Sequence, residues 1–141
     1  MPVIIEEPSC RAAHHAELSD IWERSVRATH HWFDEADIRL LKATLPAHID
    51  AFAHLLVARE KEKILGFIGI HDHFMDMLFV DADMQRRGIG TALLHAAERQ
   101  FAVDSTSVLK DNQAAQAFYQ QMGYKPIRST EQELLLRKES R

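Results

Sequence analysis

The chain has 141 residues, of which 46% are hydrophobic and 27% are charged. This length is enough to bury a core, and the composition is that of a globular protein rather than a disordered or fibrous one. The net charge of -4, with no long basic block, argues against nucleic acid as the main partner and is compatible with a cationic substrate such as an amine.

The single cysteine, Cys10, excludes an internal disulfide and a zinc site built on paired cysteines. Glu6, Glu7 and Pro8 interrupt the N-terminal segment where a signal peptide needs an unbroken apolar run. No apolar run approaches the ~20 residues that a bilayer-spanning helix needs. We therefore expect one domain over residues 1–141, a cytoplasmic location and no membrane partner.

The first third of the chain is predicted to be mainly helical. An extended strand is expected around Ile4 to Ala12. Apolar residues at helical spacing then predict a helix from His14 to about Ala28 and a second from roughly Phe33 to Leu45. We expect Pro46 to end the second helix, because proline lacks a backbone N–H and its ring clashes with the preceding turn.

The rest of the chain alternates between strand and helix patterns. Residues 74–80, FMDMLFV, are nearly continuously apolar and predict a central strand that is buried on both faces. The other predicted strands are 54–59 and 64–71, joined by a charged turn, then 105–109, 124–129 and 132–138. The other predicted helices are 91–101 and 112–123, the latter closed by Gly123. Together these elements predict a mixed α/β sheet.

Two glycines, Gly88 and Gly90, lie where the predicted strand 74–80 leads into the next helix. Such a turn directs free backbone N–H groups at one point, and the helix dipole adds partial positive charge there, so anions and especially phosphates bind. The glycines remove side chains that would block contact, and Arg86 and Arg87 add positive charge at the rim. A tight turn with close helix–sheet packing is the alternative.

Two common phosphate-binding motifs do not fit these residues. No Lys-Ser/Thr pair follows the glycines, so the turn is not a P-loop. Leu93 stands where a dinucleotide-binding fingerprint needs its third glycine.

Two segments resemble motifs of the general N-acetyltransferase (GNAT) superfamily. QRRGIG, Gln85 to Gly90, is similar to the Q/R-x-x-G-x-G/A signature, and residues 112–124 are similar to the N-x-x-A-x-x-F-Y-x-x-x-G-F/Y segment. The resemblance covers about Leu55 to Arg137, and residues 21–33 also resemble a bacterial subgroup of small acetyltransferases. It implies a GNAT-like α/β fold, a twisted and mostly antiparallel sheet of about seven strands flanked by about four helices. It also implies transfer of an acetyl group from acetyl-CoA to a primary amine, without a metal.

The resemblance assigns roles to single residues. Backbone amides around the glycine turn would bind the pyrophosphate of acetyl-CoA, and the strand 74–80 would separate from its neighbour, the strand 105–109, so that the pantetheine arm enters between them. Backbone N–H groups of this strand would polarise the thioester carbonyl, and the Tyr119 phenol would protonate the leaving thiolate. The expected cofactor contacts are Phe79, Val80, Gln85, Arg86, Arg87, Gly88, Ile89, Gly90, Thr91, Asn112 and Tyr119. Asn112 is also a good helix N-cap residue.

The base that deprotonates the amine has several candidates. Asp76 lies inside the apolar strand, where an unpaired carboxylate is costly unless it has a hydrogen-bond network or a chemical task. His71 and His73 alternate with Asp72, so both are expected to point to one face and to serve instead. The histidine pair has no evident third ligand for a metal. A water chain in place of a single base is also open.

The first two helices are expected to line the acceptor pocket. The residues expected to line it are Trp22, Ser25, Thr29, His30 and Phe33, with His71 and His73. Aromatic and hydroxyl groups on one face can hold an ammonium group, although Trp22 and Phe33 can equally be plain core residues. The remaining histidines (14, 15, 48, 54 and 95) are interpreted as surface or packing residues. A small amine, an amino acid, an antibiotic, and a protein N-terminus or lysine all remain open as acceptors, as do a monomer and a homodimer.

Three other functions compete with acetyl transfer. The first is an acyl-CoA-binding sensor or catalytically inactive relative, against which the presence of Tyr119 argues. The second is an α/β domain that binds a nucleotide phosphate without acetyl chemistry. The third, an RNA-directed acetyltransferase, is disfavoured by the lack of a basic patch.

Overall fold

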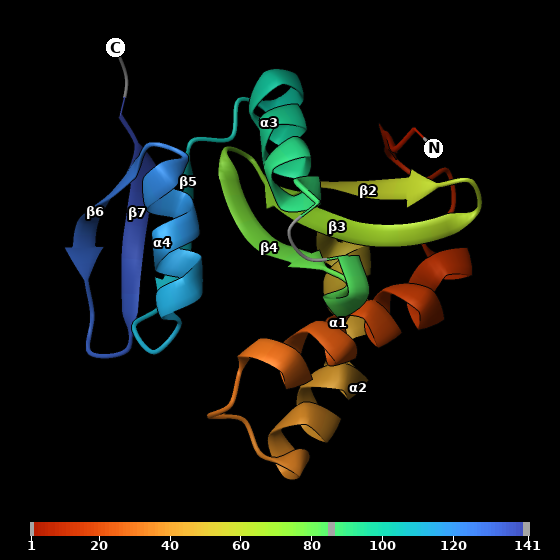
Figure 1. Ribbon diagram of the computed structural model, residues 1–141, viewed down its shortest axis with the longest axis horizontal. Helices are drawn as coiled ribbons and strands as arrows, with labels where there is room; N and C mark the ends of the chain where they lie inside the picture. Colours follow the sequence, from red (N-terminus) through yellow and green to blue (C-terminus); the bar gives the residue numbers. More distant parts are fainter. Residues whose placement is uncertain (1, 85–86, 140–141) are drawn as a thin grey trace.

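The computed structural model describes residues 2–84 and 87–139, which form a seven-stranded sheet in the order β1-β2-β3-β4-β5-β7-β6. All neighbouring strands are antiparallel except the parallel pair β4–β5 (Figure 1). The strands are β1 (Ile4–Glu6), β2 (His54–Glu60), β3 (Lys63–His71), β4 (Phe74–Val80), β5 (Ser105–Leu109), β6 (Tyr124–Ser129) and β7 (Glu133–Lys138). The helices are α1 (His15–Thr29), α2 (Glu35–Ala51), α3 (Ile89–Phe101) and α4 (Gln113–Gln121), with short 3-10 turns η1 (Ala12–His14) and η2 (Ala82–Met84). The predicted fold class and order of elements are thus confirmed.

Two boundaries in the first third differ from the prediction. The first strand ends at Glu6, and α2 continues through Pro46 to Ala51, so the expected helix break is wrong. Proline costs the helix one backbone hydrogen bond. The buried side chains of Leu45 and Ile49, one on each side of the proline, keep the helix packed against the sheet.

Strands β2 and β3 are the ones that are buried on both faces. On β2, Leu55 and Val57 pack with α1 and α2, whereas Leu56 and Ala58 pack with α3 on the opposite face. Strand β4 was expected to have this position, but only its Met75 is fully buried. The expectation for β4 is therefore wrong, because β5 pairs with it only at Phe74 and Met75 and leaves the rest of β4 without a neighbouring strand on that side in the described residues.

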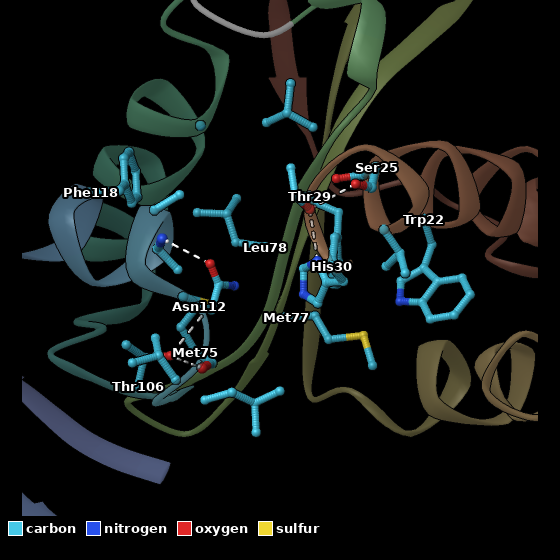
Figure 2. Close-up of a pocket in the computed structure, with 18 of the residues that line it drawn as sticks. Trp22, Ser25, Thr29, His30, Met75, Met77, Leu78, Thr106, Asn112 and Phe118 are labelled. Carbon is cyan, nitrogen blue, oxygen red and sulfur yellow. Dashed lines mark hydrogen bonds between the residues drawn. The ribbon is translucent and has the colours of Figure 1, made fainter. Parts of the chain in front are cut away.

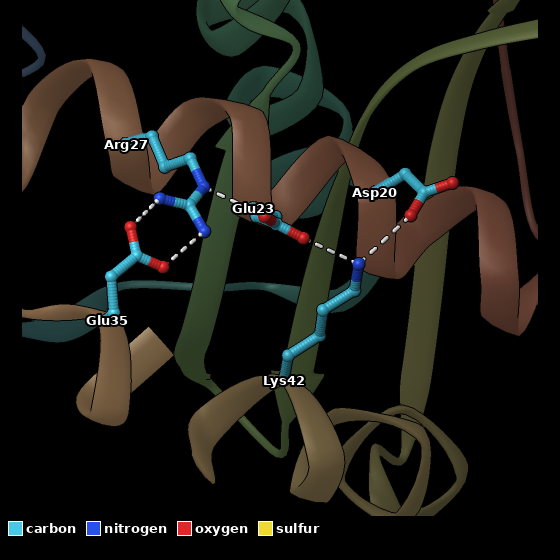
Figure 3. Close-up of polar contacts among 5 residues, drawn as sticks. All are labelled: Asp20, Glu23, Arg27, Glu35 and Lys42. Atoms are coloured by element: carbon cyan, nitrogen blue, oxygen red, sulfur yellow. Dashed lines mark hydrogen bonds and ion pairs between the residues drawn. The ribbon is translucent and has the colours of Figure 1, made fainter. Parts of the chain in front are cut away.

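A network of exposed ion pairs joins α1 to α2 (Figure 3). Arg27 binds Glu23 on its own helix at 2.8 Å and forms a two-point pair with Glu35. Lys42 of α2 bridges Glu23 at 2.6 Å and Asp20 at 3.2 Å. Each exposed pair contributes little to stability alone, and the network mainly fixes how the two helices lie against each other.

Candidate active site

The sheet divides where β4 meets β5. The two strands pair only at Phe74 with Ser105 and at Met75 with Thr106, and the Thr106 hydroxyl donates to the Met75 carbonyl at 2.8 Å. Beyond this point the strands separate, with β5, β6, β7 and α4 on one side of the gap and β1 to β4 on the other (Figure 1). A cavity of about 620 Å³ lies there. The separation that the family resemblance implied is therefore present.

A β-bulge at Asp76 redirects β4 at the vertex of this fork. Met75 pairs with Ile70 and Met77 pairs with Gly69, so Asp76 is the extra residue with no partner on β3. A bulge bends its strand and reverses which residues face which side. Met77 and Phe79 consequently face α1 and α2, while Leu78 and Val80 face α3 and α4. The sequence pattern did not reveal the bulge, because every residue around Asp76 is apolar.

The Asp76 carboxylate is not buried, contrary to the expectation. Its side chain is 38% exposed, lines the cavity and lies 3.9 Å from the Nε2 of His71. As a bulge residue it turns out of the apolar core, so the expected cost of an unpaired buried carboxylate does not arise.

The two histidines near it do not share a face, and neither lines the cavity. His71 ends β3, whereas His73 lies in the tight turn that follows, where Asp72 adopts a left-handed φ of 53°. The His73 ring then lies against the Ala102 carbonyl, with Nδ1 at 3.1 Å. The turn reverses the chain between the two histidines, so the expected alternation is wrong.

One end of the cavity is formed by the N-terminus of α3. Gly88 caps this helix with a φ of 77°, a conformation that other residues adopt only with strain, and no side chain caps the helix. Apart from its chain neighbours, no atom of the described residues lies within 4 Å of a Cβ built at Gly88, so the space beside this residue is open. Ile89, Gly90 and Thr91 also line the cavity. The arrangement suits an anion.

Arg87, predicted to add positive charge beside Gly88, is placed differently. Arg87 is outside the cavity lining, and its guanidinium binds the Glu60 carboxylate at 3.0 Å and the Met84 sulfur at 2.9 Å. Gln85 and Arg86 lie outside the described residues. In the described part of the chain, α3 therefore presents no charged side chain to the cavity, and its first main-chain amides remain to bind an anion there.

The wall formed by β5 and α4 carries Tyr119 and Asn112. Tyr119 is 6% exposed, and its hydroxyl lies 3.9 Å from the Met75 sulfur. Burial raises the pKa of this phenol above its ordinary value, and a hydrogen bond with Thr106 opposes the rise only in part. The phenol is therefore protonated at neutral pH. Asn112 is the N-cap of α4 through its bond with the Ala115 amide at 3.1 Å, and it also lines the cavity.

The opposite wall is α1, which contributes Trp22, Ser25 and Thr29, with its C-cap residue His30 and with Phe33 beyond its end. Figure 2 shows Trp22, Ser25, Thr29 and His30 on one side of the strand that carries Met75, Met77 and Leu78, with Asn112, Thr106 and Phe118 on the other side. The Thr29 hydroxyl donates to the Ser25 carbonyl at 2.8 Å and lies 2.7 Å from Nδ1 of His30. All five residues that we expected near the acceptor from this segment thus lie together.

Sequence reasoning assigned no role in the site to four polar residues, Arg24, His48, Asp81 and Glu133. Asp81, directly after β4, is buried and receives two hydrogen bonds from Arg24 of α1, at 3.0 and 2.8 Å. The Arg24 guanidinium holds the pKa of this carboxyl below its usual range. His48 and Glu133 line the cavity, although His48 was interpreted as a surface or packing residue. Only Asp81 had a sequence signal, as a carboxylate between an apolar strand and the glycine turn.

Neither a metal nor a membrane is indicated in the described part of the chain. No group of three His, Cys, Asp or Glu side chains there has an arrangement that would hold a metal ion. None of the helices in residues 2–84 and 87–139 is both long and apolar enough to cross a membrane.

Comparison with known proteins gives concordant matches. Residues 28–134 match the family model of the acetyltransferase (GNAT) domain. The chain is 36% identical over 115 residues to the peptidyl-lysine N-acetyltransferase YjaB of Escherichia coli K12, covering 77% of this chain and 74% of that protein. The solution structure of apo YjaB from Escherichia coli matches with a TM-score of 0.85 and 28% identity over 97% of both chains. The crystal structure of the PaiA N-acetyltransferase from Thermoplasma acidophilum in complex with coenzyme A matches with a TM-score of 0.83 and 19% identity, over 99% of this chain and 100% of that one.

Proposed function

The chain belongs to the GNAT family of acetyltransferases, and on that premise we propose that it transfers the acetyl group of acetyl-CoA to the side-chain amine of a peptide lysine. The observation that carries the proposal is the fork between β4 and β5. It opens a single cavity that runs from the uncapped N-terminus of α3 to the aromatic wall of α1. We take residues 1–141 as one catalytic domain.

The donor half of the cavity fits acetyl-CoA. The first amides of α3 would bind the diphosphate, because the open space at Gly88 lets phosphate oxygens approach the main chain. The pantetheine arm would extend along β4 into the fork, where Phe79 and Val80 line the cavity. Backbone N–H groups aimed at the developing oxyanion would then stabilise it.

Tyr119 would supply the proton that the leaving sulfur needs. The hydroxyl lies at the vertex of the fork beside Met75, and its buried environment keeps it in the protonated form. Since the phenol has no charged partner among the described residues, it can pass its proton to a thiolate without first breaking an ion pair.

The acceptor half of the cavity fits a cationic amine on an apolar stem. The charged side chains that line the cavity in the described part of the chain are the carboxylates of Asp76 and Glu133, with no Lys or Arg among them. The carboxylates would attract an ammonium group, and Phe33, Leu41 and Met77 would pack against the methylenes of a lysine. The name of the relative YjaB, a peptidyl-lysine N-acetyltransferase, supports the same acceptor.

The proton of the amine nitrogen would leave to Asp76 or to a network of water and histidine in the acceptor half. Asp76 lines the cavity, and two histidines, His30 and His48, do so as well. His71 and His73 lie outside the lining and are not needed for this role.

A panel of amines tests the proposal directly. Free thiol released from acetyl-CoA is measured with lysine peptides, free lysine, peptides with a free N-terminus and small diamines as acceptors. We expect turnover with lysine peptides and acetylation at Nε by mass spectrometry. Binding of acetyl-CoA without thiol release from any acceptor would contradict the proposal and would favour an acyl-CoA sensor.

A further inference from the structure

The position of protons on the His30 ring follows from its neighbours at the end of α1. A hydroxyl has one proton, and that of Thr29 goes to the Ser25 carbonyl, which can only accept. The contact of 2.7 Å between Thr29 and His30 therefore requires the imidazole Nδ1–H to donate to the Thr29 oxygen. In a neutral ring Nε2 then carries a lone pair. Figure 2 shows both hydrogen bonds.

We propose that His30 is the catalytic base for the amine, with Nε2 as the proton acceptor and Thr29 as the residue that fixes its tautomer. The inference deepens the proposed function and rests on it. The ring lies in the cavity between the aromatic rings of Trp32, Phe33 and Phe79, with centroids 4.7, 5.3 and 6.3 Å away. Because Phe79 belongs to β4, the ring stands over the strand along which the thioester would lie. No described residue hydrogen-bonds to Nε2.

The charge state of the ring fits this task. Burial lowers the pKa of His30 below its ordinary value, and the neighbouring His31 lowers it further. The imidazole is therefore neutral at physiological pH and ready to accept a proton. The other titratable groups that line the cavity are His48, Asp76, Tyr119 and Glu133.

His30 and Tyr119 complete the proton balance of the reaction. The bound ammonium group first loses one proton to solvent. The neutral amine then attacks the thioester carbonyl carbon, and the C–N bond forms while Nε2 of His30 takes the second proton that the nitrogen loses. The C–S bond then breaks, its electron pair stays on sulfur, and the Tyr119 phenol protonates the thiolate. Solvent returns one proton to Tyr119 and removes one from His30, so the products are the amide and free CoA. The base and the acid come from opposite walls of the cavity, α1 and α4.

The other candidates for the base, Asp76 and His48, are positioned less favourably for proton transfer. The Asp76 carboxylate is turned toward His71, at 3.9 Å, and the ring of His71 lies edge-on against Phe52. His48 lies exposed on α2, and no described side chain fixes its tautomer. His30 alone combines a position in the cavity with a ring nitrogen whose protonation a neighbour determines.

The first test is the tautomer itself, which needs no turnover. Long-range ¹H–¹⁵N spectra of the ring should show a protonated Nδ1 and a bare Nε2 for His30. Thr29→Val, which removes the hydroxyl, should shift the ring toward a mixture of tautomers, whereas Thr29→Ser should keep the wild-type spectrum. A ring protonated at Nε2 in the wild-type protein would overturn the proposal.

The second test is kinetic, with a lysine peptide as acceptor. His30→Gln should lower kcat/KM for the peptide by about 10²- to 10³-fold, the range of a lost general base, with the Kd of CoA unchanged. It should also remove the acidic limb of the pH profile, that is, the fall in kcat/KM at low pH as the base is protonated. If His30 had a merely structural role, this limb would remain. Thr29→Val should lower kcat/KM and Thr29→Ser should not. His95→Gln, exposed on α3, should match the wild type.

The outcomes separate the two proposals. If the wild-type enzyme acetylates the peptide and the His30→Gln variant keeps both its rate and the acidic limb, only the role of His30 is contradicted. The proposed function then stands. A wild-type protein that binds acetyl-CoA but releases no thiol with any amine contradicts the proposed function, and the role of His30 with it.

Discussion

Arg24→Ala should destabilise the protein more than any single change in the exposed ion-pair network. The side chain of Asp81 is 2% exposed, and Arg24 binds both of its oxygens. The pair joins α1, the acceptor wall, to the turn between β4 and α3, the donor end. Removing Arg24 leaves a buried carboxylate without its partner. An unpaired buried charge lowers the free energy of unfolding more than replacement of both partners by apolar residues does.

The size of the effect follows from the exposure of the two partners. Loss of one member of a fully buried pair costs about 3–5 kcal/mol. The Arg24 side chain is 48% exposed, so water can enter the space it leaves and hydrate the carboxylate in part. We therefore expect a loss of about 1–3 kcal/mol in the free energy of unfolding, and a fall of roughly 4–12 °C in Tm.

The effect should also depend on pH. Because Arg24 lowers the pKa of Asp81, the pair contributes stability above the pKa of an unfolded Asp, and this is lost as pH falls through the folded value. Without Arg24 the buried carboxyl of Asp81 is protonated more easily in acid. Protonation removes the buried charge and with it most of the free-energy cost of the substitution. The difference in stability between wild type and Arg24→Ala should therefore narrow from pH 7 toward pH 4.

Urea unfolding followed by circular dichroism measures this difference, with Arg27→Ala as the matched control. Arg27 also forms a two-point pair with a carboxylate, Glu35, but both partners are exposed. The control should lose less stability, and most of its loss should disappear in 0.5 M salt, as screening requires. Equal losses for the two variants would refute the reasoning from burial.

Three further changes test the site. Tyr119→Phe keeps the packed ring, so it should lower kcat by about 10²-fold while calorimetry finds the Kd of CoA unchanged; full activity would remove the residue from the mechanism. Gly88→Ala should lose about 1 kcal/mol of stability, because φ is positive there, and should raise the KM for acetyl-CoA; an unchanged KM would count against contact between this turn and the diphosphate. Asp76→Asn should raise the KM for the peptide and keep the acidic limb of the pH profile, and loss of that limb would restore Asp76 as the base.

The sequence predicted the elements of the fold well because their signals are local. Turn residues and apolar periodicity placed the strands and the helices within a few residues of their observed bounds, except at the ends of β1 and α2. The error at Pro46 arose because tertiary packing of α2, through Leu45 and Ile49, outweighs the one hydrogen bond that proline removes.

The site was predictable only where its residues belong to a contiguous motif. Gly88 and Tyr119 lie in such motifs, and Thr29 and His30 follow the helical spacing of α1. The bulge at Asp76 and the pair of Arg24 with Asp81 depend on contacts between distant segments, so no local pattern contains them. For the same reason Arg87 was expected at the phosphate, whereas its guanidinium binds Glu60 across the fold.

The central claim is that main-chain amides at the start of α3 bind a diphosphate whose thioester arm enters the fork between β4 and β5. Isothermal titration of the folded protein with CoA and with pantetheine, which lacks the diphosphate, tests it most directly. The account predicts clear binding of CoA and binding of pantetheine that is at least tenfold weaker. Equal affinities, or no heat with CoA, would contradict it.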